Sequence, residues 1–101
     1  MIKAEGVKIL LLSHPHNPSG RVWKEEEVKS MVRICKKYDV VIVSDEILAD
    51  LTLMSRGIKF YSLAREFPNY SKIIIANSIS KAFNYSSLQG GYAFTADRHL
   101  Y

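Results

Sequence analysis

The stretch KIIIANSISKAFN, residues 72–84, joins an apolar, β-branched run to small hydroxyl residues and a lysine. Three consecutive isoleucines, Ile73, Ile74 and Ile75, are typical of a strand that is buried on both faces of a parallel sheet. Lys81 follows just beyond the carboxyl end of that strand. A lysine in this place is either a solvated loop cation or an amine held for chemistry, and taken alone it favours the solvated cation. The other motifs of the chain decide between the two.

Length and composition restrict the class of protein. A chain of 101 residues, 48% hydrophobic and 24% charged, is typical of one globular core. The net charge of +4 comes from lysines and arginines interleaved with glutamates, which argues against nucleic-acid binding. Cys35 is the one cysteine and lies on an apolar helical stripe, so we expect a small core residue. No apolar run approaches a membrane span, and we expect a cytoplasmic protein that binds no membrane.

Hydrophobic periodicity predicts an α/β fold. The long helix has an apolar stripe at Val28, Met31, Val32 and Cys35, with acidic residues near its start and lysines near its end. The strands should form a mostly parallel sheet with flanking helices, and the last strand should be antiparallel because its connection is short. No linker interrupts the chain, so we expect no internal domain boundary. The predicted elements are strands at 7–12, 40–43, 73–76 and 92–95, a helix at 24–38 and a short helix near 62–66.

Polar side chains follow the carboxyl ends of three predicted strands: Asn17, Asp45 and Lys81. Ligands of open α/β sheets bind at this edge. Pro15 and Pro18 stiffen the loop that carries Asn17, which suits a contact residue, although a simple strand-to-helix turn explains the loop equally well. An acid, an amine and an amide suit a planar cofactor that needs a protonated ring nitrogen, a covalent amine and a hydrogen bond to a phenolate. Pyridoxal phosphate (PLP) has these needs.

Three motifs carry a resemblance to a known family. HPHNPSGRVW at 14–23, SDEILADL at 44–51 and SISKAFN at 78–84 resemble the fold-type I PLP-dependent enzymes of aminotransferase class I/II, and within them the cystathionine β-lyase or C–S lyase branch. The resemblance covers nearly the whole chain. Enzymes of this family are much longer, so the resemblance implies that residues 1–101 are the central part of a PLP-binding large domain, which is a three-layer α/β/α structure.

The resemblance also implies roles for individual residues. Lys81 would bind the cofactor as a Schiff base and then act as the general base at the substrate's Cα. Asp45 would keep the pyridine nitrogen protonated, and Asn17 would hydrogen-bond the 3-hydroxyl oxygen. Ser78 matches the family position that hydrogen-bonds the cofactor phosphate, and Ser80 is a second phosphate contact.

Two positions depart from the family pattern. Leu48 stands where many aminotransferases have tyrosine and the lyase branch commonly has histidine. Gln89 stands where aminotransferases usually have an arginine for the phosphate, and this loss favours the lyase branch. The family's glycine-rich phosphate loop and its arginine for the substrate carboxylate have no counterpart in this sequence.

Three functions remain open. The first is β-elimination from a sulfur amino acid such as cystathionine, which gives a thiol, pyruvate and ammonia. The second is amino-group transfer from an amino acid, which starts from the same loss of the Cα proton. The third is a non-catalytic module that docks on a partner. For either enzyme the resemblance implies a homodimer, and we expect the 101 residues alone to be inactive because a single long helix leaves apolar sheet surface uncovered.

Other chemistries are weakly supported. Asp45 after an apolar strand resembles a P-loop NTPase motif, but no G-x-x-x-x-G-K-[ST] sequence is present. The S-x-x-K spacing of Ser78 and Lys81 lacks the S-D-N and K-T-G partners of acyl-serine enzymes. The histidines have no metal-ligand spacing, so we expect no metal site and interpret them as loop or surface residues: His14, His16 and His99.

Overall fold

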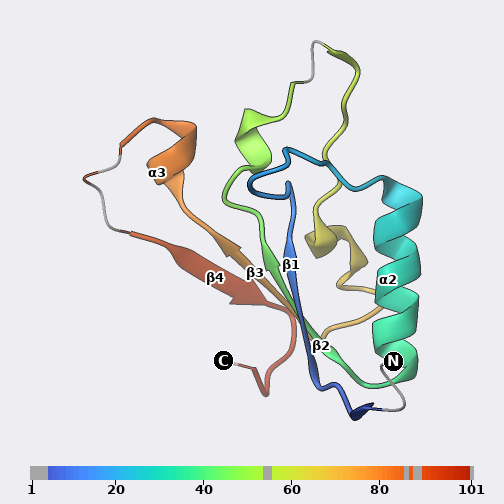
Figure 1. The fold of residues 1–101 in the computed structure, drawn as a ribbon. Helices are drawn as coiled ribbons and strands as arrows, with labels where there is room; N and C mark the ends of the chain where they lie inside the picture. Colours follow the sequence, from blue (N-terminus) through green and yellow to red (C-terminus); the bar gives the residue numbers. More distant parts are fainter. Residues whose placement is uncertain (1–4, 54–55, 86, 88–89, 101) are drawn as a thin grey trace.

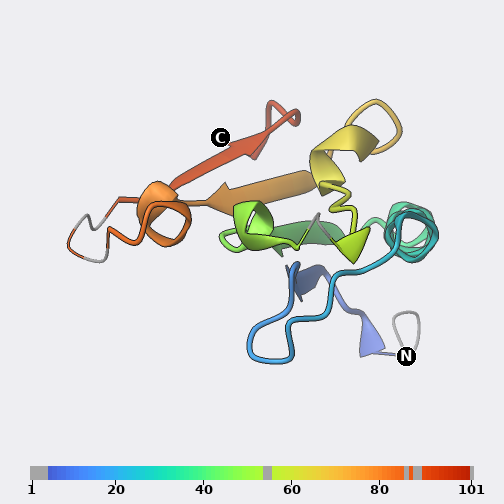
Figure 2. The ribbon, with the colours of Figure 1, turned by 90° about the horizontal axis from the view of Figure 1, so that it is seen from above.

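The computed structural model describes residues 5–53, 56–85, 87 and 90–100, and Figures 1 and 2 show it from two directions. A four-stranded sheet lies beside the long helix α2. Within these ranges no helix is long and apolar enough to cross a membrane. In chain order the elements are β1 (Ile9–Ser13), α2 (Glu25–Lys37), β2 (Val41–Asp45), the 3-10 turns η1 (Ala49–Leu51) and η3 (Leu63–Glu66), β3 (Ile73–Asn77), α3 (Ile79–Ala82) and β4 (Tyr92–Thr95).

The sheet has the strand order β1-β2-β3-β4. β1 and β3 both run parallel to β2, whereas β4 is antiparallel to β3. The prediction of a mostly parallel sheet with an antiparallel last strand is therefore confirmed. The short helix expected near 62–66 is the 3-10 turn η3, whose preceding residue Ser62 accepts a hydrogen bond from the Ala64 N–H.

The first two strands lie later in the chain than predicted. β1 begins at Ile9 instead of residue 7, and β2 runs to Asp45 instead of ending at residue 43. Strand pairing is the reason, because Ser13 pairs with Asp45, which in turn pairs with Ala76. Asp45 is thus the last residue of β2 rather than the residue that follows it.

The core lies on one face of the sheet, where α2 and η3 pack in both views (Figures 1 and 2). The predicted apolar stripe faces it, since Val28, Val32 and Cys35 are buried. Burial also raises the pKa of the Cys35 thiol, so this residue is the expected core cysteine rather than a nucleophile. The sheet contributes Ile42, Ile73 and Ile75, which are at most 1% exposed.

The opposite face of the sheet is largely uncovered in the described residues. Leu11 is 76% exposed and Ile9 is 57% exposed, while Val43 and Ile74 are half-buried. These side chains alternate with the buried ones along each strand. The prediction that β2 and β3 are buried on both faces is therefore wrong for this chain. An open apolar face, which the presence of a single long helix predicts, is what the structure contains.

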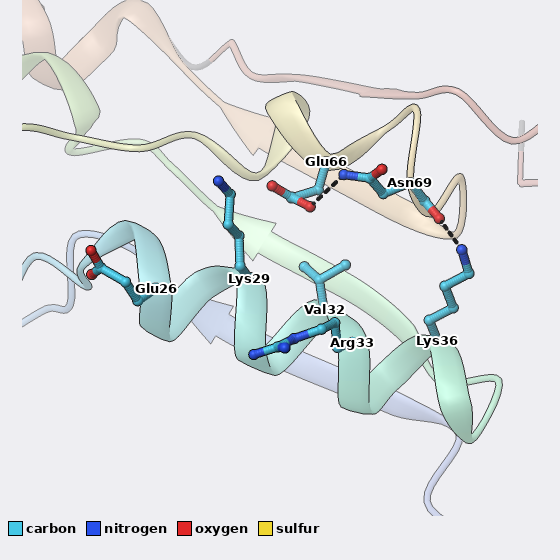
Figure 3. A pocket seen from close by; sticks show the side chains of 7 residues that line it. All are labelled: Glu26, Lys29, Val32, Arg33, Lys36, Glu66 and Asn69. Carbon is cyan, nitrogen blue, oxygen red and sulfur yellow. Dashed lines mark hydrogen bonds between the residues drawn. The ribbon is translucent and has the colours of Figure 1, made fainter.

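α2 is held against the turn that follows η3 (Figure 3). The Lys36 ammonium donates a hydrogen bond of 2.6 Å to the Asn69 carbonyl oxygen, and the Asn69 side chain donates to the Glu66 carboxylate at 3.0 Å. A groove of about 510 Å³ lies between the two segments. Its lining is Glu26, Lys29, Val32, Arg33, Lys36, Glu66 and Asn69, which includes none of the predicted site residues.

Candidate active site

The carboxyl ends of β1, β2 and β3 lie at one edge of the sheet, at the top of Figure 1. Asp45 lies centrally there, because it pairs with Ser13 of β1 on one side and with Ala76 of β3 on the other. The His14 N–H donates to the Asp45 carbonyl oxygen at 2.9 Å, and the Glu46 N–H donates to the Ala76 carbonyl oxygen at 2.9 Å. The Asp45 side chain is exposed, and its Oδ1 accepts a hydrogen bond of 3.1 Å from the Ile47 N–H. Its carboxylate is thus oriented but open to a ligand.

The loop that carries Asn17 is tightly closed. Ser13 Oγ accepts from the Asn17 N–H at 3.3 Å and donates to the Pro15 carbonyl oxygen at 3.2 Å. At the tip, the His16 carbonyl oxygen accepts from the Gly20 N–H at 2.8 Å, and Gly20 has a φ of +69° that other residues rarely adopt. The rigidity expected from the prolines is supported by these bonds, and the Asn17 side chain is exposed.

Lys81 lies in the one-turn helix α3 rather than in a loop, which the sequence did not predict. Ser78 precedes the helix, and its Oγ accepts a hydrogen bond of 3.2 Å from the Ser80 N–H. The Ser78 hydroxyl is buried and also contacts the Ser80 hydroxyl and the Gly90 carbonyl oxygen. Lys81 is exposed, and the ion pairs of the described ranges use other basic residues: Arg21, Lys29 and Lys72.

The donor set at this edge fits the predicted cofactor chemically. A carboxylate, an amine, an amide and two hydroxyls are carried by elements at the ends of three neighbouring strands. The charged heads of Asp45 and Lys81 are exposed, so bringing them to a ligand requires no rearrangement of the core. Within the described ranges, no group of three or more His, Cys, Asp or Glu residues is arranged to hold a metal ion.

Comparison with known proteins identifies the family. Residues 2–100 match aminotransferase class I and II. The chain belongs to this family. It is 37% identical over 93 residues to cystathionine β-lyase PatB of Bacillus subtilis and 34% identical over 87 residues to aspartate aminotransferase of Geobacillus stearothermophilus. These alignments cover 91% and 85% of this chain, but only 24% and 22% of the relatives.

Comparison with a solved structure agrees with this family assignment. The PLP-bound C–S lyase from Staphylococcus hominis superposes with a TM-score of 0.89 at 37% identity, covering 98% of this chain and 25% of that enzyme. The predicted fold-type I α/β architecture is thereby confirmed. The chain spans about a quarter of the length of the relatives that it matches.

Of the two positions that depart from the family pattern, the structure describes Leu48 but not Gln89. Leu48 is half-buried and lines an apolar groove of about 270 Å³ that also contains Pro15, Leu51 and Ile58. Its side chain therefore packs and offers no hydrogen bond to a ligand. Gln89 lies outside the described residues.

Two polar residues beside this sheet edge are buried, which the sequence did not predict: His14 and Glu46. His14 is 0% exposed, so its interpretation as a surface residue is wrong, although it does lie in a loop. Glu46 is 3% exposed, and its Oε1 accepts from the Leu63 N–H at 2.9 Å and from the Ser44 hydroxyl at 3.2 Å. Both residues adjoin a strand end, and polar residues directly after a buried strand are the signal that could have identified them.

Proposed function

We propose that the polypeptide containing this chain is a PLP-dependent enzyme that eliminates the β-substituent of a sulfur amino acid such as cystathionine. The observation that carries this proposal is the placement of Lys81, Asp45 and Ser78 on elements at one sheet edge. The similarity to a cystathionine β-lyase and to a PLP-bound C–S lyase supports the same chemistry. We further propose that residues 1–101 are the central part of the PLP-binding large domain.

The side chains of this chain have distinct tasks in the proposed reaction. Bound PLP supplies a conjugated ring that accepts the electron pair left when the Cα proton departs. Lys81 holds the cofactor covalently, and its freed amine takes the Cα proton as general base. Asp45 keeps a proton on the ring nitrogen by charge, and the Asn17 amide donates a hydrogen bond to the 3-oxygen. The Ser78 and Ser80 hydroxyls donate to the phosphate.

Amino-group transfer is the second candidate, because aspartate aminotransferases are nearly as similar to the chain as the lyases are. The two reactions share the step at Cα and differ in whether the β-substituent leaves. A neutral Gln89 in place of the usual arginine favours elimination. Incubation with cystathionine should release pyruvate and a thiol without an added 2-oxo acid. A requirement for a 2-oxo acid, with conversion of that acid into an amino acid, would identify an aminotransferase.

The cofactor assignment has a direct chemical test. Borohydride reduction of the PLP-loaded polypeptide, followed by peptide mapping, should place the pyridoxyl group on Lys81. Lys81→Ala should bind PLP only noncovalently. Lys72→Ala is the matched control, because Lys72 precedes the same strand and its ammonium is paired with Asp39 at 2.6 Å. Labelling of any lysine other than Lys81 would refute the assignment.

We also propose that the whole protein is a homodimer in the cytoplasm. Both proposals rest on the family membership of the chain. Sedimentation of the purified protein tests the first, because a monomer at micromolar concentration would contradict it. Fractionation of cells that express the protein tests the second.

A further inference from the structure

His14 bonds three separate segments at the sheet edge. Its backbone N–H donates to the Asp45 carbonyl oxygen at 2.9 Å. Its ring Nε2 lies 3.0 Å from the Tyr61 carbonyl oxygen, and its Nδ1 lies 3.4 Å from the Trp23 backbone nitrogen. The ring is also packed against Phe60, with centroids 4.7 Å apart. A single buried imidazole thus joins the end of β1, the start of α2 and the 60–61 segment.

The hydrogen bonds fix the protonation of the ring. The Trp23 N–H can only donate, so Nδ1 must accept, and the proton must then reside on Nε2, where it is donated to Tyr61. Burial lowers the pKa of His14, against the opposing effects of the Tyr61 carbonyl and of Glu46. The neutral ring is therefore the form that satisfies both neighbours.

The Trp23 bond closes the loop at its base. His14 begins the loop and Trp23 ends it, so the imidazole joins the two ends of the segment that carries Asn17. Ser13 and the 16–20 turn tighten the loop from within, but they do not connect it to the rest of the molecule. The Tyr61 bond connects the base of the loop to a segment 47 residues further along the chain, and the Arg21 ion pair with Glu27 connects the loop to α2.

We propose that His14 is a positioning residue for the cofactor site, whose side chain holds the loop that carries Asn17 in place without itself contacting the ligand. This inference rests on the proposed function, since the groups that it positions are those assigned to PLP. Pre-set groups bind a ligand with a smaller loss of conformational freedom. Removal of the His14 bonds should therefore weaken cofactor binding more than it weakens the fold.

The test compares three variants of the polypeptide that carries this chain. His14→Phe keeps the ring volume but removes both side-chain hydrogen bonds. His14→Gln keeps one hydrogen-bond acceptor and one donor, so it should retain part of the affinity for PLP that His14→Phe loses. Tyr70→Phe is the matched control, because it removes a buried hydrogen bond of 2.9 Å to the Val40 carbonyl oxygen at the other end of the sheet.

We expect the Kd for PLP to rise about tenfold in His14→Phe and less in His14→Gln, because His14→Phe removes both oriented hydrogen bonds and His14→Gln keeps one donor and one acceptor. Backbone amides of residues 16–22 should exchange hydrogen faster in His14→Phe before PLP is added. Tyr70→Phe should lower the Tm but leave the Kd and this exchange unchanged. A wild-type Kd in His14→Phe, or an equal rise in Tyr70→Phe, would overturn the positioning role. Failure of the wild-type polypeptide to bind PLP would instead refute the proposed function.

Discussion

At the scale of single residues, Asp45 shows how the end of a strand can fix the position of a carboxylate that remains accessible to a ligand. Its backbone is bonded to β1 and its neighbours Ser44 and Glu46 are buried, yet its own side chain is exposed. The backbone of Asp45 is therefore held in place, and its carboxylate is accessible to a ligand.

Asp45→Asn should keep the fold and abolish most of the turnover. The substitution preserves the size of the side chain and its acceptor for the Ile47 N–H, but it removes the charge that would hold the proton on the ring nitrogen. Loss of an oriented charge of this kind commonly lowers kcat about 10²–10³-fold or more. Steady-state kinetics and circular dichroism of the full polypeptide measure the two effects. Turnover within a few fold of wild type would contradict the role of Asp45.

Local sequence predicted the positions of Asn17, Asp45 and Lys81 at one edge, because each follows an apolar run that forms a strand. It did not predict that His14 is buried. The residues around His14 are turn formers, which are usually exposed, whereas its hydrogen-bond partner Tyr61 lies far along the chain. The contact with Tyr61 depends on the tertiary fold, so the local sequence indicates a polar residue at a strand end but not the burial of that residue.

At the scale of elements, the long helix and the last strand were predicted with nearly their observed bounds, because both have strong periodicity or clear turn signals. The helix α3 was missed because a single turn of four residues is too short to show an apolar repeat. The ends of β1 and β2 were misplaced because strand pairing, rather than hydrophobicity, decides where a ladder stops.

The turn η3 depends on a buried carboxylate. Glu66 accepts hydrogen bonds from the Tyr61 hydroxyl at 2.6 Å and from the Asn69 side chain at 3.0 Å. Burial raises the pKa of Glu66, but the hydrogen bonds from Tyr61 and Asn69, together with the charge of Lys29, more than offset this effect, so the pKa lies below its usual value. The ionised form therefore stabilises the folded state.

Glu66→Gln should lower the free energy of unfolding by about 2 kcal/mol at neutral pH, as expected for hydrogen bonds to a charged group. A carboxylate whose pKa is depressed on folding stabilises the fold above its unfolded pKa, and this contribution is lost as the pH falls through the folded value. The difference between wild type and Glu66→Gln should therefore fade below about pH 4.3. Denaturant unfolding at several pH values measures it, and a difference that does not depend on pH would contradict this account.

At the scale of the whole molecule, the two faces of the sheet are unequal. One face holds the core, while the other presents Ile9 and Leu11 with half-buried Val43 and Ile74 beside them. β1 is also an edge strand of the sheet. An exposed apolar face next to an open edge favours association.

Residues 1–101 produced alone should therefore self-associate and should not turn over cystathionine. Leu11→Lys places a charge on the open face and should shift the population toward monomer in sedimentation experiments. Ile34→Lys is the matched control, because Ile34 is 46% exposed but belongs to α2 on the other side of the sheet. A stable wild-type monomer with lyase activity, or an equal effect of both substitutions, would refute this prediction.

The Ser78 hydroxyl is already hydrogen-bonded within the protein, and this limits how it can bind a phosphate. A serine hydroxyl carries one proton, and in this structure that proton is directed to the Gly90 carbonyl oxygen or to Ser80. The bond to Gly90 joins the two ends of the segment that carries Lys81. Donation to a phosphate would release this closure, so anion binding at Ser78 and loop closure by Ser78 are mutually exclusive. Binding of a phosphate would thus replace the hydrogen bond from Ser78 to Gly90 by a hydrogen bond from Ser78 to the phosphate.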